Sequence, residues 1–127
     1  MADPTRIVIL GGGFAGVLAA RRLERLCKKR PDVQVTLISR DNFLLMTPLM
    51  FEACTGTLEL RHCSVSIRAF LRRTRFIEGI VQRIDLDGRI VLATWGEEGA
   101  VHQVPYDQLV LARIILSPPR ATGLFVV

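Results

Sequence analysis

The chain has 127 residues, half of them hydrophobic, so it is one domain in size and can bury a sizeable core. Its net charge is +5, for which we weigh three interpretations: a solvated basic surface, which we favour, an anionic membrane surface as partner, and nucleic acid. The basic residues have no aromatic residues interleaved to stack on bases, so we expect no nucleic-acid partner.

The first element is a short apolar run, Ile7 to Leu10, which predicts a strand buried on both faces. It is followed by Gly11-x-Gly13-x-x-Gly16 and then by a helical pattern. In such a turn the first glycine permits a sharp bend, the second lets a phosphate approach the backbone, and the third lets the helix pack closely. The N–H groups and the dipole at the helix N-terminus favour phosphate. We therefore predict a dinucleotide site here and favour it over an ordinary flexible turn.

The helix is expected to end near Arg30, because Pro31 cannot continue it and the basic residues before it suit the negative end of the dipole. Its apolar residues share one face at 100° per residue, and its arginines and lysines share the other. The predicted buried face consists of Gly16, Ala19, Ala20, Leu23, Leu26 and Cys27.

A second strand is predicted over residues 33–39, which gives a parallel, right-handed strand–helix–strand unit. Its end should lie beside an adenosine ribose, where dinucleotide sites usually place a carboxylate. This sequence has Ser39 there. A serine can still bond one hydroxyl, Arg40 could face the adenine or a phosphate, and Asp41 is a weaker substitute because it lies beyond the strand end. The acidic half of the fingerprint is therefore absent.

Residues 40–63 show neither helical nor strand periodicity. Two interpretations stay open: a loop lying in a groove against a planar ligand, and a loop packed on its own core. Residues 64–73 fit a short helix capped by Ser64 or Ser66.

The following residues predict an antiparallel meander inserted after the parallel unit. Strands are expected over 75–84, 89–94 and 101–104, with Asp87-Gly88 as the first hairpin turn. Residues 106–112 then return as a buried apolar strand. We expect His102 to be a surface residue, because no partner stands at ligand spacing.

The remaining sequence features concern metals, redox state and membranes. Cys27, Cys54 and Cys63 have no metal-ligand spacing with the two histidines, so no metal site is predicted, and a reduced cytoplasmic setting is the simplest interpretation. A redox disulfide between Cys54 and Cys63 is a less favoured alternative. The N-terminus lacks signal-peptide features and no apolar run approaches the roughly 18 residues of a spanning helix, so we expect no membrane span.

Five segments in linear order resemble the N-terminal part of a type II NADH dehydrogenase, an FAD-containing NADH:quinone oxidoreductase of the two-dinucleotide-binding-domain flavoprotein superfamily. They are Gly11-Gly-Gly-Phe-Ala-Gly16, residues 35–38, residues 42–56, residues 79–84 and residues 106–112. The resemblance implies an α/β fold: a Rossmann-like FAD-binding parallel sheet with an inserted antiparallel meander, incomplete relative to the family.

The resemblance also implies a cofactor site and no catalytic side chain. The glycine turn would hold the FAD pyrophosphate, through Gly11, Gly12, Gly13, Phe14, Ala15 and Gly16. Ser39 and Arg40 would meet the adenosine, Leu44 and Pro48 would line the cofactor cleft, Val81 would contact adenine through its backbone, and Ala112 would lie where the closing strand reaches FAD.

The family's reaction is hydride transfer from NADH to FAD and then electron delivery to a quinone at the cytoplasmic face of the membrane. We expect residues 1–112 to be a partial FAD/NAD(P)-binding domain and residues 113–127 to be a divergent tail, produced by a frameshift or truncation. The alternative functions are a non-catalytic dinucleotide-binding remnant without NADH and quinone sites, and a subunit completed by another chain. The sequence predicts no particular oligomeric state.

Overall fold

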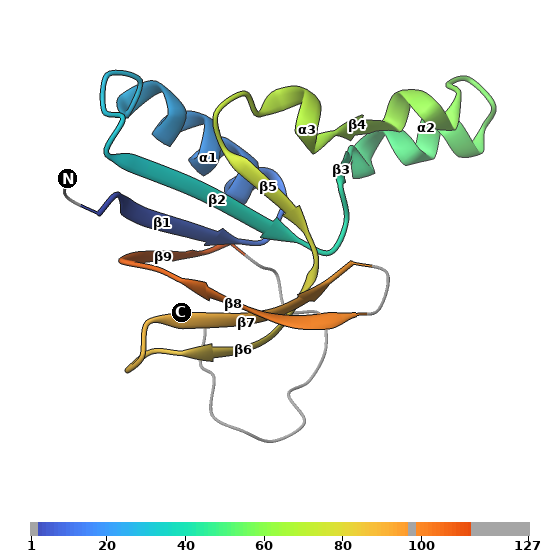
Figure 1. Cartoon of the computed structure of the whole chain (residues 1–127). Coiled ribbons are helices and arrows are strands. Elements are labelled where there is room, and N and C mark those ends of the chain that lie inside the picture. Colours follow the sequence, from blue (N-terminus) through green and yellow to red (C-terminus); the bar gives the residue numbers. More distant parts are fainter. Residues whose placement is uncertain (1–2, 97–98, 113–127) are drawn as a thin grey trace.

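A computed structural model describes residues 3–96 and 99–112. The divergent tail predicted over residues 113–127 lies outside the described residues. Figure 1 shows a sheet with a helix on one face and a second, smaller sheet on the other.

The central element is a four-stranded parallel sheet, and its strands lie in the order β5-β2-β1-β9. The strands are β1 (Thr5–Leu10), β2 (Val33–Ser39), β5 (Arg75–Glu78) and β9 (Gln108–Leu111). In register, Leu10 pairs with Ile38 and with Leu111, while Ser39 pairs with Glu78. All four carboxyl ends therefore meet at one edge of the sheet, as the predicted Rossmann-like unit requires.

Helix α1 (Phe14–Leu26) covers one face of this sheet, and the predicted buried face is right except at Leu26, while the end of the helix differs from the prediction. Gly16, Val17 and Ala20 are its buried residues, whereas Leu26 is 64% exposed. Ala19 and Leu23 are partly buried, and Val17, which the prediction left out, is fully buried. The helix ends at Leu26 rather than near Arg30, and the next three residues form a turn.

The antiparallel meander is present as a three-stranded sheet with the order β6-β7-β8. Its strands are β6 (Ile80–Asp85), β7 (Ile90–Trp95) and β8 (Ala100–Pro105). The predicted continuous strand 75–84 is wrong, because the chain changes sheets at Gly79. The Gly79 N–H donates to the Ser39 carbonyl over 2.8 Å, so residues 75–78 extend the parallel sheet and only the remainder joins the meander.

Two apolar clusters fill the spaces on either side of the parallel sheet, because neighbouring residues of each strand point to opposite faces. The cluster between the two sheets contains Val8, Leu10, Ile38, Ile77, Val91, Ala93 and Tyr106. The cluster under the helices contains Ile9, Val17, Ala20, Val35, Leu37, Ile67 and Leu71. Burial on both faces explains why the strands appear in the sequence as continuous apolar runs.

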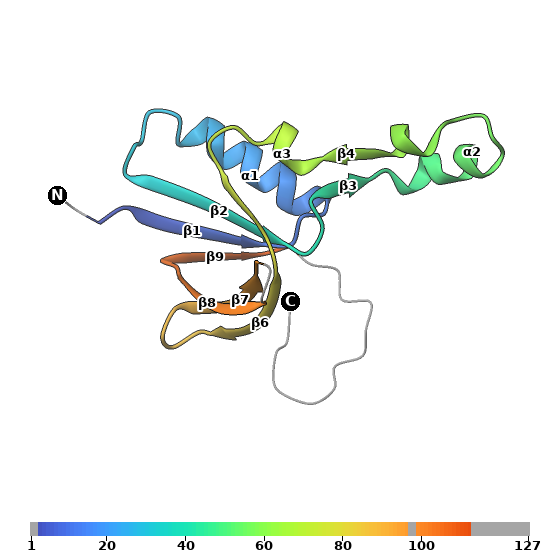
Figure 2. The same ribbon diagram turned by 45° about the vertical axis from the view of Figure 1, so that its right-hand side comes forward.

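The segment from residue 43 to residue 66, which we name the arm, extends away from the body in both views (Figures 1 and 2). Its short elements are β3 (Phe43–Leu45), a 3-10 turn (Thr47–Leu49), α2 (Met50–Cys54), a second 3-10 turn (Leu60–Cys63) and β4 (Ser64–Ser66). β3 and β4 form an antiparallel pair at its base.

The helix predicted over residues 64–73 is mostly wrong. Residues 64–66 are in β4, and only the four residues of α3 (Ile67–Phe70) are helical. Ser66 occupies the N-cap position, but its side chain makes no capping hydrogen bond. Within residues 3–96 and 99–112, no helix is long and apolar enough to cross a bilayer.

Candidate functional site

The glycine turn between β1 and α1 has positions that only glycine fits. Gly11 has φ of 107°, in the left-handed region, and its N–H donates to the Ile38 carbonyl over 2.9 Å. A Cβ on Gly16 would overlap the carbonyl oxygen of Gly11. The first and third glycines therefore have the roles predicted for them, a sharp bend and a close helix contact.

The start of α1 offers room and charge for an anion. A Cβ added to Gly13 would meet no heavy atom of the described structure within 4 Å. No side chain caps this helix end, and its first turn contains no acidic residue. The first N–H groups of an α-helix have no partner inside the helix and lie at the positive end of its dipole. The residues present therefore fit a diphosphate, which is the anionic centre of a dinucleotide.

Ser39 lies directly beside this turn. A Cβ added to Gly12 would come within 2.7 Å of both the Ser39 Cβ and the Ile67 Cδ1. The end of β2 and the start of α3 therefore pack against the glycine turn. Arg40 points instead to solvent, where its Nη2 lies 3.3 Å from the Asp41 carboxylate.

Ala112, at the end of β9, also reaches the glycine turn. Its N–H donates to the Leu10 carbonyl over 2.9 Å, and its methyl lies 3.4 Å from the Cβ position of Gly16. The structure thus brings together the glycine turn, Ser39 and Ala112 from three neighbouring strand ends.

The other predicted residues lie further from the turn. Leu44 and Pro48 belong to the arm, where Leu44 is buried and Pro48 is exposed. Phe14 and Ala15 are exposed at the first turn of α1, and Val81 is half-buried in β6. The strand pairing shifts between Val81 and Arg83, an irregularity that leaves part of this backbone outside the regular ladder.

One acidic residue at this edge was missed by the sequence analysis. Glu78, the last residue of β5, pairs in register with Ser39, and its Oε2 accepts a hydrogen bond from Asn42 Nδ2 over 3.1 Å. The continuous strand predicted over 75–84 placed this carboxylate in mid-strand. Gly79 was the signal that could have placed it at a strand end.

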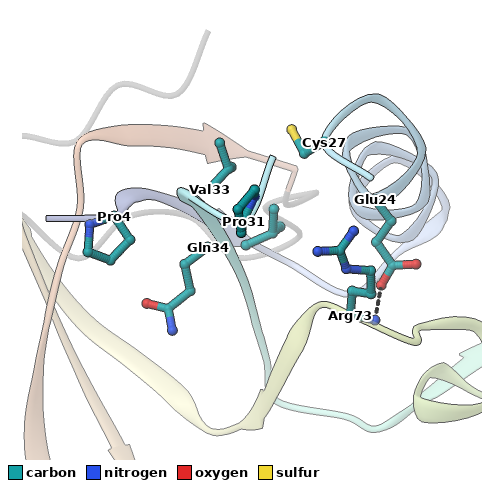
Figure 3. A pocket seen from close by; sticks show the side chains of 8 residues that line it. Pro4, Glu24, Cys27, Pro31, Val33, Gln34 and Arg73 are labelled. Atoms are coloured by element: carbon teal, nitrogen blue, oxygen red, sulfur yellow. Dashed lines mark hydrogen bonds between the residues drawn. The ribbon is translucent and has the colours of Figure 1, made fainter. Parts of the chain in front are cut away.

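Two hollows in the described part of the chain lie away from the glycine turn. One, of about 310 Å³, lies at the amino ends of β1 and β2, with Cys27, Gln34 and the neighbouring Glu24 and Arg73 around it (Figure 3). The other, of about 300 Å³, lies between the two sheets near Trp95 and His102, whose rings stack at 3.9 Å. Neither contains a residue of the glycine turn.

Comparison with known proteins agrees with the fold. The family model described as pyridine nucleotide-disulphide oxidoreductase matches residues 5–113. A type II NADH:quinone oxidoreductase of Mycobacterium tuberculosis is 36% identical over 110 residues, which is 84% of this chain and 22% of the relative. A type II NADH:quinone oxidoreductase of Haemophilus influenzae is 32% identical over 114 residues, covering 84% of this chain and 26% of the relative.

Solved structures of flavoprotein-type oxidoreductases match the same fold. The NDH2 structure from Plasmodium falciparum in complex with NADH matches with a TM-score of 0.68 and 26% identity, covering 86% of this chain and 22% of that one. The sulfide:quinone oxidoreductase of Aquifex aeolicus matches with a TM-score of 0.67 and 28% identity, covering 84% and 24%. This chain therefore spans only about a quarter, or less, of the proteins it matches.

These matches confirm the predicted resemblance and the Rossmann-like α/β fold class. Since the family model covers most of the chain, the chain belongs to the pyridine nucleotide-disulphide oxidoreductase family.

Proposed function

We propose that this chain is the FAD-binding part of an oxidoreductase of the type II NADH:quinone kind. The observation that carries the proposal is the uncapped start of α1 behind a glycine turn, with open space at Gly13. The similarity to type II NADH:quinone oxidoreductases supports FAD as the dinucleotide and NADH and a quinone as the substrates of the complete arrangement.

Each part of the proposed site has a distinct task. The N–H groups from Gly12 to Gly16 are proposed to bind the FAD diphosphate, while Gly11, whose N–H donates to the Ile38 carbonyl, supplies the bend. Ser39 and, from its solvent-exposed position, Arg40 are proposed to meet the adenosine. The irregular pairing beside Val81 supports a backbone contact with adenine. Ala112 closes the site next to Gly16, while Leu44 and Pro48 are proposed to line the cofactor cleft from the arm.

FAD would supply the redox chemistry, as acceptor of a hydride and donor of electrons to a quinone. The side chains of this chain bind and orient it, and none is proposed as a nucleophile. In the complete arrangement we propose a peripheral position at the cytoplasmic face of a membrane.

A second candidate function is a dinucleotide-binding module that does not turn over. The observation that favours it is the extent of the match, 22% and 26% of the two relatives compared above. Under this proposal, the NADH and quinone sites belong to parts outside the matched region.

Titration of the purified chain with FAD tests both candidates. The expected result is saturable quenching of flavin fluorescence with one FAD per chain, and absence of any saturable change contradicts the proposal. An NADH:quinone assay of the loaded protein then separates the candidates. Turnover excludes the non-catalytic module, and bound FAD without turnover favours it.

A further inference from the structure

The dinucleotide site lacks a carboxylate at the position where the general pattern places one. In such sites an acidic residue at the end of the second strand accepts hydrogen bonds from the ribose hydroxyls. Here that residue is Ser39, which lies against the glycine turn. A serine hydroxyl carries no charge, so its hydrogen bond to a ribose would be weaker than that of a carboxylate.

The neighbouring strand, β5, ends in a carboxylate beside Ser39. Ser39 pairs with Glu78 in the parallel ladder between β2 and β5, so the two residues stand side by side at the carboxyl edge of the sheet. Glu78 is exposed, as a ligand-binding group at this edge must be.

Both side chains start from the same face of the sheet. Leu37 and Phe76, each two residues earlier in its strand, contact the cluster under the helices, whereas Ile77 contacts the cluster between the sheets. Because side chains alternate along a strand, Ser39 and Glu78 both leave the sheet on its helix side. That is the side on which α1 and the glycine turn lie.

The Glu78 carboxylate is also held in position. Asn42 Nδ2 donates to Glu78 Oε2 over 3.1 Å, and the Asn42 carbonyl accepts from the N–H of Ile67 over 2.8 Å. Ile67 in turn packs against Gly12 in the glycine turn. A chain of contacts thus links the carboxylate to the proposed diphosphate site, and the structure describes no hydrogen bond to Oε1.

We propose that Glu78, at the end of β5, supplies the carboxylate that accepts a hydrogen bond from the adenosine ribose, in place of the acidic residue absent from the end of β2. The inference rests on the proposed FAD site. It makes Glu78 a specificity-determining residue, because a carboxylate at this position accepts a hydrogen bond from the ribose 2′-hydroxyl that FAD carries and not from an analogue without it.

The test compares Glu78→Gln with the unsubstituted chain in titrations with two ligands. These are FAD and an FAD analogue whose adenosine ribose lacks the 2′-hydroxyl. Glutamine keeps one oxygen that can accept from Asn42 and replaces the other carboxylate oxygen, with its charge, by an NH2 group that cannot accept from a ribose hydroxyl. The matched control is Asp87→Asn, which removes one negative charge in the exposed β6–β7 turn. Thermal melting confirms that each variant is folded.

For Glu78→Gln, we expect FAD affinity to fall about 10- to 100-fold, the size expected for a hydrogen bond to a charged group. The unsubstituted chain should bind the deoxy analogue more weakly than FAD by a similar factor. The Glu78→Gln variant should bind FAD and the deoxy analogue with about the same affinity, because the interaction that distinguishes them is already lost. Asp87→Asn should bind FAD as the unsubstituted chain does.

Two results overturn the inference while leaving the proposed function intact. One is unchanged FAD affinity in Glu78→Gln, and the other is an equal loss for FAD and for the deoxy analogue. If the unsubstituted chain binds no FAD, the proposed function itself fails and the inference fails with it.

Discussion

Gly13 and Gly16 stand three residues apart in the same turn, yet their surroundings predict opposite effects of the same substitution. Gly13 has φ of −75°, which any residue adopts, and its Cβ position is open. Gly13→Ala should therefore fold, with the free energy of unfolding lower by no more than about 1 kcal/mol, the cost of alanine at an N-cap. The added methyl occupies the space proposed for the diphosphate, so FAD affinity should fall about tenfold or more. Fluorescence titration measures the affinity and urea unfolding the stability. Undiminished FAD binding would contradict a diphosphate at this position.

Gly16→Ala should instead damage the fold. The new Cβ would overlap the Gly11 carbonyl oxygen, which belongs to the backbone and has no other rotamer to adopt. The helix start must then move away from the turn, and we expect the free energy of unfolding to fall by about 1–3 kcal/mol, as for other overpacked sites. Urea unfolding measures this loss. A variant as stable as the unsubstituted chain would show that α1 does not depend on this close contact.

At the scale of elements, the connection between α1 and the loop before β5 depends on one carboxylate. Glu24 Oε1 accepts from the backbone N–H groups of Arg72, Arg73 and Thr74 over 3.0, 2.8 and 2.7 Å. Burial raises the pKa of Glu24, but the hydrogen bonds from Arg73, Thr74 and Arg72 together lower it below its ordinary value of 4.5. Figure 3 shows Glu24 reaching from the helix to the Arg73 backbone.

This arrangement predicts a dependence of stability on pH. Because the pKa of Glu24 is lower in the folded chain than in the unfolded chain, its contribution is complete above about pH 4.5 and is lost as the pH falls through the folded value. Glu24→Gln should lower the free energy of unfolding by about 1 kcal/mol at pH 7, and its difference from the unsubstituted chain should shrink in acid. Urea unfolding between pH 3 and pH 7 measures both effects.

The matched control for this effect is Glu52→Gln in α2. The carboxylate of Glu52 accepts no hydrogen bond within the described part of the chain, so this variant loses a charge without losing a hydrogen bond. A Glu24→Gln variant with the same stability difference at pH 3 and pH 7 would show that the Glu24 charge does not stabilise the connection.

The elements that the sequence predicted well are those whose pattern is local. The strand over residues 7–10, the glycine turn and the Asp87-Gly88 hairpin each carry their signal within a few residues. The break at Gly79 depends instead on a partner distant in sequence, since residues 75–78 pair with β2. Mistaking that break for a continuous strand also hid Glu78. The exposure of Leu26 was missed because the predicted helix continued to Arg30, whereas α1 ends at Leu26.

At the scale of the whole molecule, a body with two apolar clusters carries an arm with little core of its own. Leu44 and Cys63 are the arm's buried residues among those with described side chains, whereas Phe51 is 78% exposed. The sequence analysis left open whether residues 40–63 pack on their own core. The extended arm does not, and its apolar composition alone could not distinguish a buried loop from a projecting one (Figure 2).

This difference between body and arm predicts where a protease cuts first. Local opening costs least where few apolar contacts are lost, so the arm should open far more often than the sheets. The endoproteinase that cleaves after glutamate has sites at Glu52 and Glu59 in the arm and at Glu24 and Glu78 in the body, which serve as internal controls of the same residue type. The cleavage rates are measured in a time course followed by mass spectrometry. Cleavage after Glu52 and Glu59 should be about tenfold or more faster than cleavage after Glu24 and Glu78, since each 1.4 kcal/mol of opening free energy is a factor of ten. Equal rates at all four sites would mean that arm and body open together, as a single cooperative unit.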